Sequence, residues 1–454
     1  MARVKEKALT LEEKLAQALV PVEEQPYEVP ENWCWCRLSE AISTSKEKTE
    51  VFSDPSVKYI GLEHMERNRG IVSYGSPEGI KSSKNVFHDG QILYGKLRPY
   101  LNKHGIASFD GICSTDILVF DSLATTIPQY ADYYLNLDFF IQYVVANSKG
   151  INLPRVSEST VLDAVYPLPP LPEQHRIVEH IERLFAQLDQ AKEKAHAVID
   201  GYEDRRASIL HRAFTGELTE EWRQDQRISF DSWIVKPLCD LCDRIFDGPF
   251  GSNLKSDDYV EKGIRVVRLE NLKNLWFDDS KKSFVTEEKY SSISGHTVYP
   301  TDLIMATFIA DEIKICQMPE YIGYAVNKAD CIGIRVSNGT DKRFVLYYLS
   351  SKQTFNHLFN QLHGATRPRV NTKQIKAIPV PLPTLAEQAE IVRILDSLLS
   401  KESAAKSLAE RAIAQIDATK QSILARAFRG ELGTNDPEDE PAIELLKRTL
   451  ETRA

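Results

Sequence analysis

The sequence lacks the features of a membrane or secreted protein. No apolar run among its 454 residues approaches the roughly 18 to 20 residues of a transmembrane helix. The first residues are charged and show neither the apolar core nor the small-residue cleavage site of a signal peptide. Its seven cysteines are odd in number and scattered, which favours reduced thiols. These absences together predict a cytoplasmic protein.

Metal-binding and catalytic motifs are also missing. Cys239 and Cys242 form a lone Cys-x-x-Cys pair with no second pair and no nearby histidine, so we expect no metal site. The sequence has no amino-methyltransferase motif, phosphate-binding loop, dinucleotide-binding glycine pattern, nucleophile elbow or zinc-protease motif. Asp257 and Asp258 resemble nuclease carboxylates only loosely, because the nuclease Glu-x-Lys spacing is absent. We therefore expect no catalytic residues in this chain.

Basic charge is not in excess. The formal net charge is −9, from 56 Lys and Arg against 65 Asp and Glu. A protein that binds DNA alone usually carries a strong basic excess, because neutralised phosphates supply most of its affinity. If this chain binds DNA, a partner is expected to supply much of the phosphate contact.

What the sequence does contain is an internal repeat. Residues 150–218 align without a gap with residues 364–432, at an offset of 214, and roughly 26 of 69 aligned positions are identical. The matches come in blocks such as Pro-Arg-Val, Pro-Leu-Pro, Glu-Gln, Ser-Ile-Leu and Gly-Glu-Leu. The segments between the two copies hardly match. A chain that repeats its connectors but not its intervening segments is organised as a pseudo-dimer.

Each copy of the repeat predicts a long helix. A proline-rich stop precedes it, Pro172 suits a first helical turn, and Thr384 to Glu387 form a capping-box pattern. Apolar residues then step by four and three, the seam of a coiled coil, which breaks at Arg205, Thr419 and Glu402. Each helix would span about 40 residues, or about 60 Å. Because the chain must return, we expect the helices to pair antiparallel, as a rod with a domain at each end and a pseudo-two-fold axis.

The segments outside the helices predict two small mixed domains of the α/β (α+β) class. Strands are expected at 57–62, 91–94 and 117–120 in the first domain, and at 264–269, 302–306 and 332–336 in the second. Helices are expected at 130–145 and 344–362, with a short helix at 10–19 and a tail helix at 442–450. The expected divisions are an N-terminal helix and arm (1–30), a first domain (31–168), a first long helix (169–218), a second domain (219–383), a second long helix (384–432), and an acidic linker with the tail helix (433–454).

These paired motifs resemble the specificity subunit of type I restriction–modification enzymes. The resemblance is carried by PLPPLPEQHRIVEHIERLF and PLPTLAEQAEIVRILDSLL, by the endings SILHRAFTGELTEEWR and QSILARAFRGEL, and by the opening LEEKLAQALVPVEEQPYEVPENWCWCRL. It covers essentially the whole chain. It implies two target recognition domains, each reading one half of a bipartite double-stranded DNA target, separated by two conserved helices.

The resemblance also implies partners. Two methyltransferase subunits would dock on the helices and methylate adenine at N6 with S-adenosylmethionine. Two motor-nuclease subunits would translocate and cleave DNA with ATP and Mg²⁺. All cofactors would belong to those partners and none to this chain. Glu173-Gln174 and Glu387-Gln388, which begin the two helices, are the expected methyltransferase docking residues.

DNA reading requires basic and amide side chains at base edges and phosphates. In the first domain the densest candidate segment interleaves basic and aromatic residues. The candidates are Lys81, Lys84, Tyr94, Lys96, Arg98, Tyr100, Asn102 and Lys103 there, and Asn253, Lys255, Arg265, Arg268, Asn271 and Lys273 in the second domain. Arg155 and Arg369 recur in both copies, so they cannot encode a difference between half-sites. These two are expected to be structural or to position phosphates.

Two other hypotheses remain. A stand-alone sequence-specific DNA-binding protein would need affinity without a partner, which the charge balance disfavours. An enzyme with a degenerate nuclease or methyltransferase site would show metal-dependent nicking or S-adenosylmethionine binding by the isolated chain.

Overall fold

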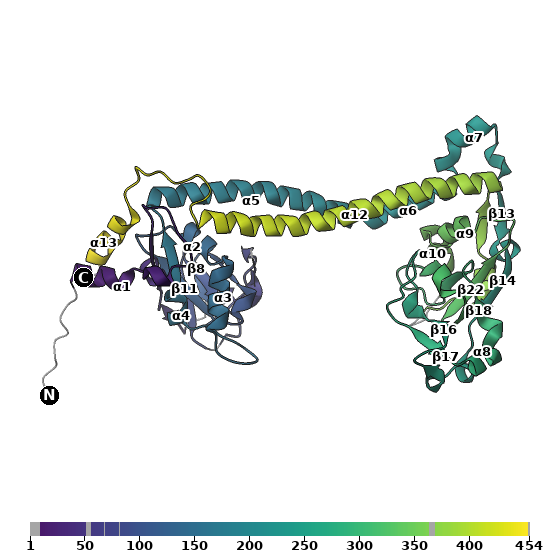
Figure 1. Ribbon diagram of the computed structural model, residues 1–454, viewed down its shortest axis with the longest axis horizontal. Coiled ribbons are helices and arrows are strands. Elements are labelled where there is room, and N and C mark those ends of the chain that lie inside the picture. The colour runs from purple at the N-terminus through teal and green to yellow at the C-terminus, as the bar shows by residue number, and fades with distance from the viewer. Residues whose placement is uncertain (1–9, 51–55, 68, 81, 363–367, 453–454) are drawn as a thin grey trace. The chain divides into compact units, whose positions relative to one another are not determined.

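The computed structural model describes residues 10–50, 56–67, 69–80, 82–362 and 368–452. The chain folds into two compact units (Figure 1). Unit 1 comprises the residues up to Lys194 and from Ala412 onward, and unit 2 comprises Ala195–Arg411. Each unit contains one mixed domain and part of each long helix, which confirms the predicted mixed fold class.

Unit 1 contains two four-stranded sheets and a two-stranded sheet. The first has the order β2-β11-β8-β9, the second β3-β7-β10-β4, and β1 pairs with β12. The strands are β1 (Cys34–Arg37), β2 (Ile42–Thr44), β3 (Lys48–Thr49), β4 (Lys58–Ile60), β7 (Lys84–Phe87), β8 (Ile92–Gly95), β9 (His104–Ile106), β10 (Gly111–Cys113), β11 (Ile117–Ser122) and β12 (Val165–Leu168), with a hairpin of β5 (Met65–Glu66) and β6 (Gly70–Ile71).

Unit 2 repeats the first of these sheets and changes the second. The order β14-β22-β19-β20 matches the first sheet of unit 1, whereas the outer sheet has five strands in the order β15-β17-β16-β21-β18. The strands are β13 (Ile234–Pro237), β14 (Cys242–Asp247), β15 (Tyr259–Val260), β16 (Ile264–Val267), β17 (Ser283–Val285), β18 (Thr297–Val298), β19 (Leu303–Ala306), β20 (Ile315–Gln317), β21 (Ala325–Asn327), β22 (Cys331–Val336) and β23 (Pro379–Leu382), which pairs with β13.

The repeated sheet lies between helices on one face and the outer sheet on the other. In β8, Ile92 and Tyr94 pack with the helices, while Leu93 packs with residues of the outer sheet. In β19, Leu303 and Met305 pack with helical residues, and Ile304 faces the other way. Each domain is therefore a common inner frame that carries its own outer sheet.

The short helices differ from the sequence prediction in two places. The helices of unit 1 outside the long pair are α1 (Leu11–Ala18), α2 (Pro128–Tyr134), α3 (Asp138–Ala146), α4 (Glu158–Leu162) and α13 (Ala442–Thr452). The prediction of a single helix at 130–145 is wrong, because the segment forms two helices, α2 and α3. At the end of α2 the Asn102 side chain donates a hydrogen bond to the Leu135 carbonyl, at 3.0 Å. The segment at 435–440, predicted as a linker, packs against the start of α5.

In unit 2 the helix predicted at 344–362 is likewise two helices. The helices of this unit are α6 (Tyr202–Phe214), α7 (Glu220–Gln226), α8 (Glu287–Ile293), α9 (Lys342–Leu349), α10 (Lys352–Phe359) and α11 (Thr372–Lys376), with the first part of α12 (Leu385–Ala427). The Ser351 hydroxyl accepts a hydrogen bond from the Thr354 amide and so begins α10 as a new helix.

The predicted long helices are present, and the first is interrupted once. It consists of α5 (Leu171–Asp200) and α6, separated by Gly201, whereas α12 runs without a break. A Cβ on Gly201 would lie 2.5 Å from the Arg205 guanidinium, so glycine leaves room for that side chain. Arg205 donates to the Val198 carbonyl and to Glu402. Two of the three polar residues that interrupt the apolar seam, Arg205 and Glu402, are therefore partners of each other.

Ion pairs along the helices confirm that they run antiparallel. In unit 1, Asp189 pairs with Lys420 and Lys192 with Asp417, each at 2.6 Å. In unit 2, Arg205 pairs with Glu402 at 2.7 Å. As residue numbers rise in the first helix, those of the partners fall in α12.

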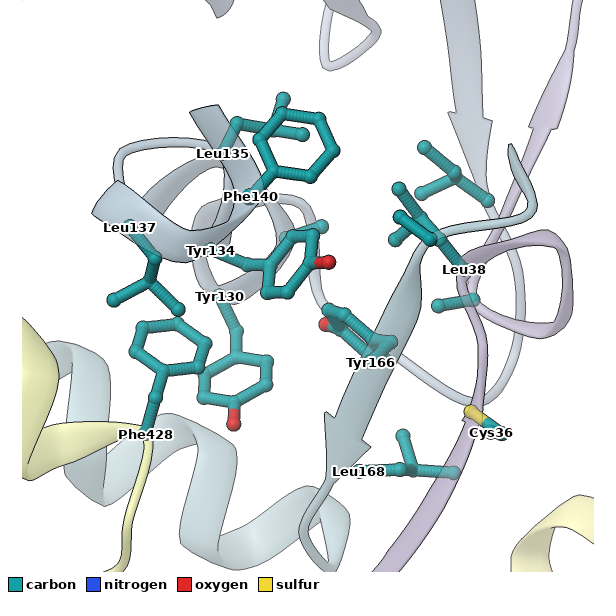
Figure 2. Packing of buried hydrophobic residues seen from close by; sticks show 14 of the residues in the cluster. Cys36, Leu38, Tyr130, Tyr134, Leu135, Leu137, Phe140, Tyr166, Leu168 and Phe428 are labelled. Carbon is teal, nitrogen blue, oxygen red and sulfur yellow. The ribbon is translucent and has the colours of Figure 1, made fainter. Parts of the chain in front are cut away.

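The ends of the long helices close on the domains through aromatic contacts. Phe428, at the end of α12, stacks on Tyr130 with ring centroids 4.6 Å apart, within the aromatic cluster of unit 1 (Figure 2). Phe214, at the end of α6, packs edge-on against Phe344 and Tyr348. Buried aromatic pairs add stability beyond the area they bury. The repeated Phe-x-Gly-Glu-Leu motif thus fastens one helix end in each unit.

The Glu-Gln pairs at the starts of the helices are buried, which makes the predicted docking role wrong. Glu173, Gln174 and Glu387 have no exposed surface, and Gln388 is 2% exposed. Gln174 accepts hydrogen bonds from Thr126 and from the Ile127 amide, just before α2. Gln388 accepts one from the Asp341 amide, just before α9. Each glutamine therefore ties its long helix to its own domain and leaves nothing for a partner to contact.

The two glutamates have different partners. Glu387 accepts hydrogen bonds from the Trp233 indole and Thr219 and forms a buried ion pair with Arg223 at 2.7 Å. It does not complete the predicted capping box, where only the Thr384 hydroxyl contributes its hydrogen bond.

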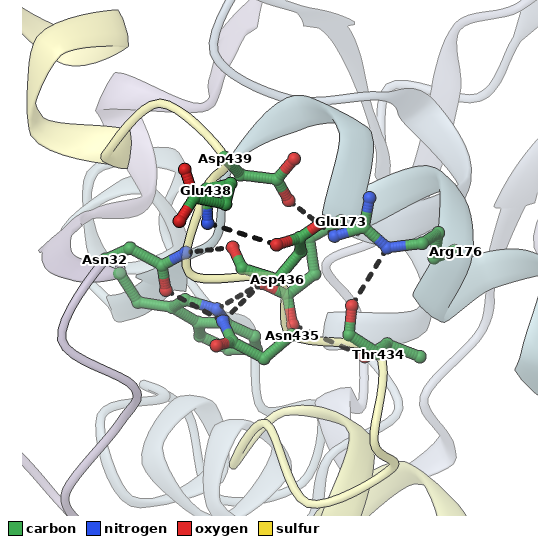
Figure 3. A network of polar contacts seen from close by, with 9 residues as sticks. Asn32, Glu173, Arg176, Thr434, Asn435, Asp436, Glu438 and Asp439 are labelled. Atoms are coloured by element: carbon green, nitrogen blue, oxygen red, sulfur yellow. Dashed lines mark hydrogen bonds and ion pairs between the residues drawn. The ribbon is translucent and has the colours of Figure 1, made fainter.

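Glu173 is held instead by neutral donors, namely the Trp33 indole, Asn435 and Thr434 (Figure 3). Arg176, one turn later, pairs with Asp439 rather than with Glu173. Burial therefore raises the pKa of Glu173 above its ordinary value of 4.5, despite the three hydrogen bonds.

This difference predicts unequal effects of one substitution. Glu387→Gln leaves the buried Arg223 guanidinium without its counter-charge, so we expect unit 2 to lose about 3 to 5 kcal/mol of unfolding free energy. Glu173→Gln keeps a hydrogen-bonding group among the neutral donors and leaves no buried cation unpaired, so it should change unit 1 by about 1 kcal/mol or less. Amide hydrogen exchange reports the opening free energy of each unit separately. Equal losses in both variants would contradict the assigned partners.

The raised pKa adds a pH dependence to unit 1. A carboxyl group whose folded pKa is raised contributes stability below its unfolded value, about 4.5, and loses it as the pH rises through the folded value. Glutamine does not titrate. Over that window we therefore expect the stability of Glu173→Gln relative to the wild type to increase with pH, as measured by hydrogen exchange in unit 1.

Candidate nucleic-acid interface

The repeated Pro-Arg-Val motif forms the same ion pair in both units. Arg155 bonds both carboxylate oxygens of Asp116, at 3.0 and 3.2 Å, and Arg369 pairs with Asp330 at 3.1 Å. Asp116 and Asp330 are themselves separated by 214 residues, like the arginines. The hydrogen bonds from Arg155 lower the pKa of Asp116. Each arginine thus has a carboxylate partner within its own domain, which supports the structural role expected for it.

Backbone hydrogen bonds repeat around these ion pairs. The Val156 amide donates to the Lys96 carbonyl and the Arg98 amide to the Pro154 carbonyl. In unit 2 the Val370 amide donates to Thr307 and the Ile309 amide to Pro368. In each unit this junction joins three segments of the inner frame: the end of β8 or β19, the start of β11 or β22, and the Pro-Arg-Val segment. We call it the clamp.

Basic side chains gather beside the clamp of unit 1. Lys96 is half-buried, and Arg98 is exposed, with a left-handed φ of 53°. Tyr100, in the short turn after Arg98, is 47% exposed. Lys149 is exposed and bridges to Arg155 through backbone hydrogen bonds in both directions, each 2.8 Å long. This group offers cations and an aromatic face to an anionic polymer.

The clamp of unit 2 lies beside a basic pocket of about 400 Å³. Its charged lining comprises Arg268, Lys273, Lys314 and Lys328 against Glu270 and Asp330. Arg268 and Lys328 both lie over the ring of Tyr259, at 5.5 and 5.6 Å from its centroid. Asp330 is already paired with Arg369, so the pocket has an excess of positive charge for a phosphate.

The structure leaves most of the predicted DNA-binding residues accessible. Lys81 lies outside the described residues. Lys103 is half-buried and donates to the Leu62 carbonyl, and Lys84 donates to Ser82. The predicted residues with exposed or half-buried side chains are Lys84, Lys96, Arg98, Tyr100, Lys103, Asn253, Lys255, Arg268 and Lys273.

Four predicted residues are buried and cannot reach a base edge. Tyr94 points from β8 into the core beside Phe140, with 0% exposure. Asn102 is 1% exposed and holds the Leu135 carbonyl. Arg265 pairs with Asp279, and burial lowers its pKa. Asn271 holds the turn after β16, accepting from the Arg268 amide and donating to the Asp278 and Lys281 carbonyls.

Sequence inspection missed Lys149, Lys314 and Lys328. None of the three has another Lys or Arg within five residues in the sequence, so no local cluster marks it. The folded chain brings Lys314 and Lys328 into one pocket with Arg268. Only the three-dimensional pairing of distant segments carries that signal.

One of the two carboxylates that loosely resemble a nuclease site, Asp258, has partners within its own domain. Asp258 accepts from the Lys255 amide and pairs with Lys289 at 3.1 Å, so it terminates a turn. Across the described ranges, no group of three or more His, Cys, Asp or Glu side chains is arranged to hold a metal ion. No helix within the described part of the chain has the length and apolar character needed to cross a membrane.

Comparison with known proteins agrees with this picture. Residues 231–410 match the type I restriction modification DNA specificity domain. The chain is 32% identical over 200 residues to the EcoDI specificity subunit of Escherichia coli, covering 43% of this chain and 45% of that protein. It is 27% identical over 312 residues to the E. coli EcoBI specificity subunit, covering 66% and 65%. The chain thus spans about half to two thirds of these relatives' length.

Solved structures share the fold. A chain of a type I R-M system superposes with a TM-score of 0.70 at 22% identity, covering 90% of this chain and 100% of that one. The HsdS subunit from Thermoanaerobacter tengcongensis gives 0.61 at 21% identity, with the same coverage. In its repeated frame, its matched domain and its relatives, the chain is similar to type I restriction–modification specificity subunits.

Proposed function

We propose that this chain is the non-catalytic DNA-specificity subunit of a type I restriction–modification complex, and that its two domains read the two halves of an asymmetric bipartite target. The observation that carries the proposal is the common inner frame with unlike outer sheets, four strands in unit 1 and five in unit 2. Two readers on one repeated frame suit two unlike half-sites. Basic groups beside the equivalent clamps supply the DNA contacts.

Partners supply the chemistry. Two methyltransferase subunits dock on the outer faces of the long helices and methylate adenine at N6 with S-adenosylmethionine, after flipping the base from the duplex. Two motor-nuclease subunits add ATP- and Mg²⁺-dependent cleavage. The net charge of −9 supports this division, because a chain without basic excess needs partners to neutralise phosphates.

Methylation mapping tests the proposal directly. The full chain is co-expressed with the methyltransferase encoded beside it, and N6-methyladenine is mapped by single-molecule sequencing. We expect a split motif of two short unlike halves around a fixed gap. A stable complex without new methylation would contradict the proposed activity. Failure of the two proteins to associate, with specific DNA binding by the chain alone, would favour a stand-alone DNA-binding protein.

Substitutions in the two basic groups should affect different halves of the motif. Removing cations weakens phosphate positioning and base reading only where they contact DNA, at about 1 to 3 kcal/mol for a good base contact. We expect Lys96→Ala/Arg98→Ala to relax or abolish one half and Lys314→Ala/Lys328→Ala the other, as measured by the same mapping.

Tyr94→Phe is the matched control for these variants. The Tyr94 hydroxyl is buried and has no hydrogen-bond partner among the described residues, so its removal should leave the motif unchanged. If both double variants relaxed the same half of the motif, the two basic groups could not belong to separate reading surfaces.

Lengthening both long helices tests whether they set the gap between half-sites. Seven residues inserted after Lys194 and seven after Arg411 preserve the heptad phase and add about 10 Å. We expect the unspecified gap to grow by about three base pairs, at about 3.4 Å each. Four residues inserted in one helix alone break the seam and should abolish methylation. An unchanged gap in an active seven-residue variant would exclude the helices as the spacer.

A further inference from the structure

A short loop of unit 1 carries an exposed apolar tip. Lys149 and Arg155 exchange both backbone hydrogen bonds, at 2.8 Å each, and so close the loop at its base. Between them Ile151 is 100% exposed and Leu153 is 46% exposed. Ile151 and Leu153 together give this closed loop an apolar tip, and burying such surface against a partner is favourable.

The loop is built to hold this tip in place. Gly150 has a φ of 108°, which other residues rarely adopt, and a Cβ there would meet the Leu153 carbonyl oxygen at 3.0 Å. The Pro154 carbonyl accepts a hydrogen bond from the Arg98 amide at 2.7 Å, and the Arg155 side chain is held by Asp116. The tip therefore projects from the clamp on a fixed base.

Positive charge lies at the base of this loop. Lys96 and Arg98 lie on the segment that follows β8, and Lys149 lies on the loop itself. Asp116, the carboxylate paired at the clamp, is already bonded to Arg155. Tyr100 and Leu101, 47% and 38% exposed, follow Arg98. An apolar tip with cations at its base suits duplex DNA, where the base stack lies between rows of phosphates.

We propose that Ile151 is a wedge that enters a base-pair step of the half-site read by unit 1. This inference rests on the proposed function. Apolar side chains inserted between base pairs unstack the step and kink the duplex. An unstacked step also lowers the cost of flipping a base for modification. Lys96, Arg98 and Lys149 hold the flanking phosphates while the side chain enters.

The wedge belongs to one domain only. At the offset of 214 residues, the sequence has Ala365 where the first copy has Ile151. Ile151→Ala therefore gives the first copy the side chain that the second copy already has. The substitution removes an exposed group, so it should leave the fold intact.

The test uses the full chain in complex with its methyltransferase and the target found by methylation mapping. Duplexes carry 2-aminopurine at successive positions of each half-site, because its fluorescence rises when its base step unstacks. Besides the rise at the adenines that the methyltransferases flip, we expect the wild type to raise fluorescence at one further step, in the half-site relaxed by Lys96→Ala/Arg98→Ala. Ile151→Ala should abolish that rise and weaken binding by about tenfold. Ile151→Leu should retain both.

Val22→Ala is the control, since Val22 is an exposed apolar residue of the N-terminal arm, and it should match the wild type. Wild-type fluorescence and affinity in Ile151→Ala would overturn the wedge while leaving the proposed function intact. Loss of methyltransferase assembly in Ile151→Ala would show that the loop binds protein, not DNA. A wild-type complex without sequence-specific methylation would instead remove the proposed function, and this inference with it.

Discussion

The buried Glu-Gln pair at the start of each long helix is the constraint on which the rest of each unit depends. Glutamate fixes the strand that opens the domain through a tryptophan indole, Trp33 in unit 1 and Trp233 in unit 2. Glutamine fixes the helix that closes the domain, through the amides of Ile127 and Asp341. Buried polar groups cost free energy when they are unpaired. These hydrogen bonds therefore fix the direction of each long helix relative to its own domain.

The clamp extends the same logic toward the reading surface. Asp116–Arg155 and Asp330–Arg369 hold equivalent loops at equivalent strand ends, whatever the outer sheet contains. A frame fixed by side chains common to both copies leaves the surrounding loops free to differ. Under the proposed function, that arrangement separates the residues that keep a domain folded from the residues that distinguish one DNA sequence from another.

The long helices, their antiparallel pairing and the seam-breaking Arg205 could be predicted from the sequence, because helical periodicity is local information. The burial of Glu173 could not be predicted, because its partners Trp33 and Asn435 lie far from it in the sequence. Tyr94 was misplaced for a related reason. Both faces of β8 are covered, so the strand has no exposed side for an aromatic residue to occupy. Lys314 and Lys328 required the pairing of distant strands.

Under the proposed function, the small size of the reading surfaces agrees with the charge balance of the chain. Beside its clamp, unit 1 presents Lys96, Arg98 and Lys149, and the pocket of unit 2 presents Arg268, Lys273, Lys314 and Lys328. Each neutralised phosphate contributes about 0.9 to the slope of log affinity against log salt concentration. A small number of phosphate contacts therefore supports only weak, salt-sensitive binding. A subunit of this kind gains by choosing sequence while others provide affinity. Strong binding by the chain alone would hold it on DNA without the catalytic groups that make recognition useful.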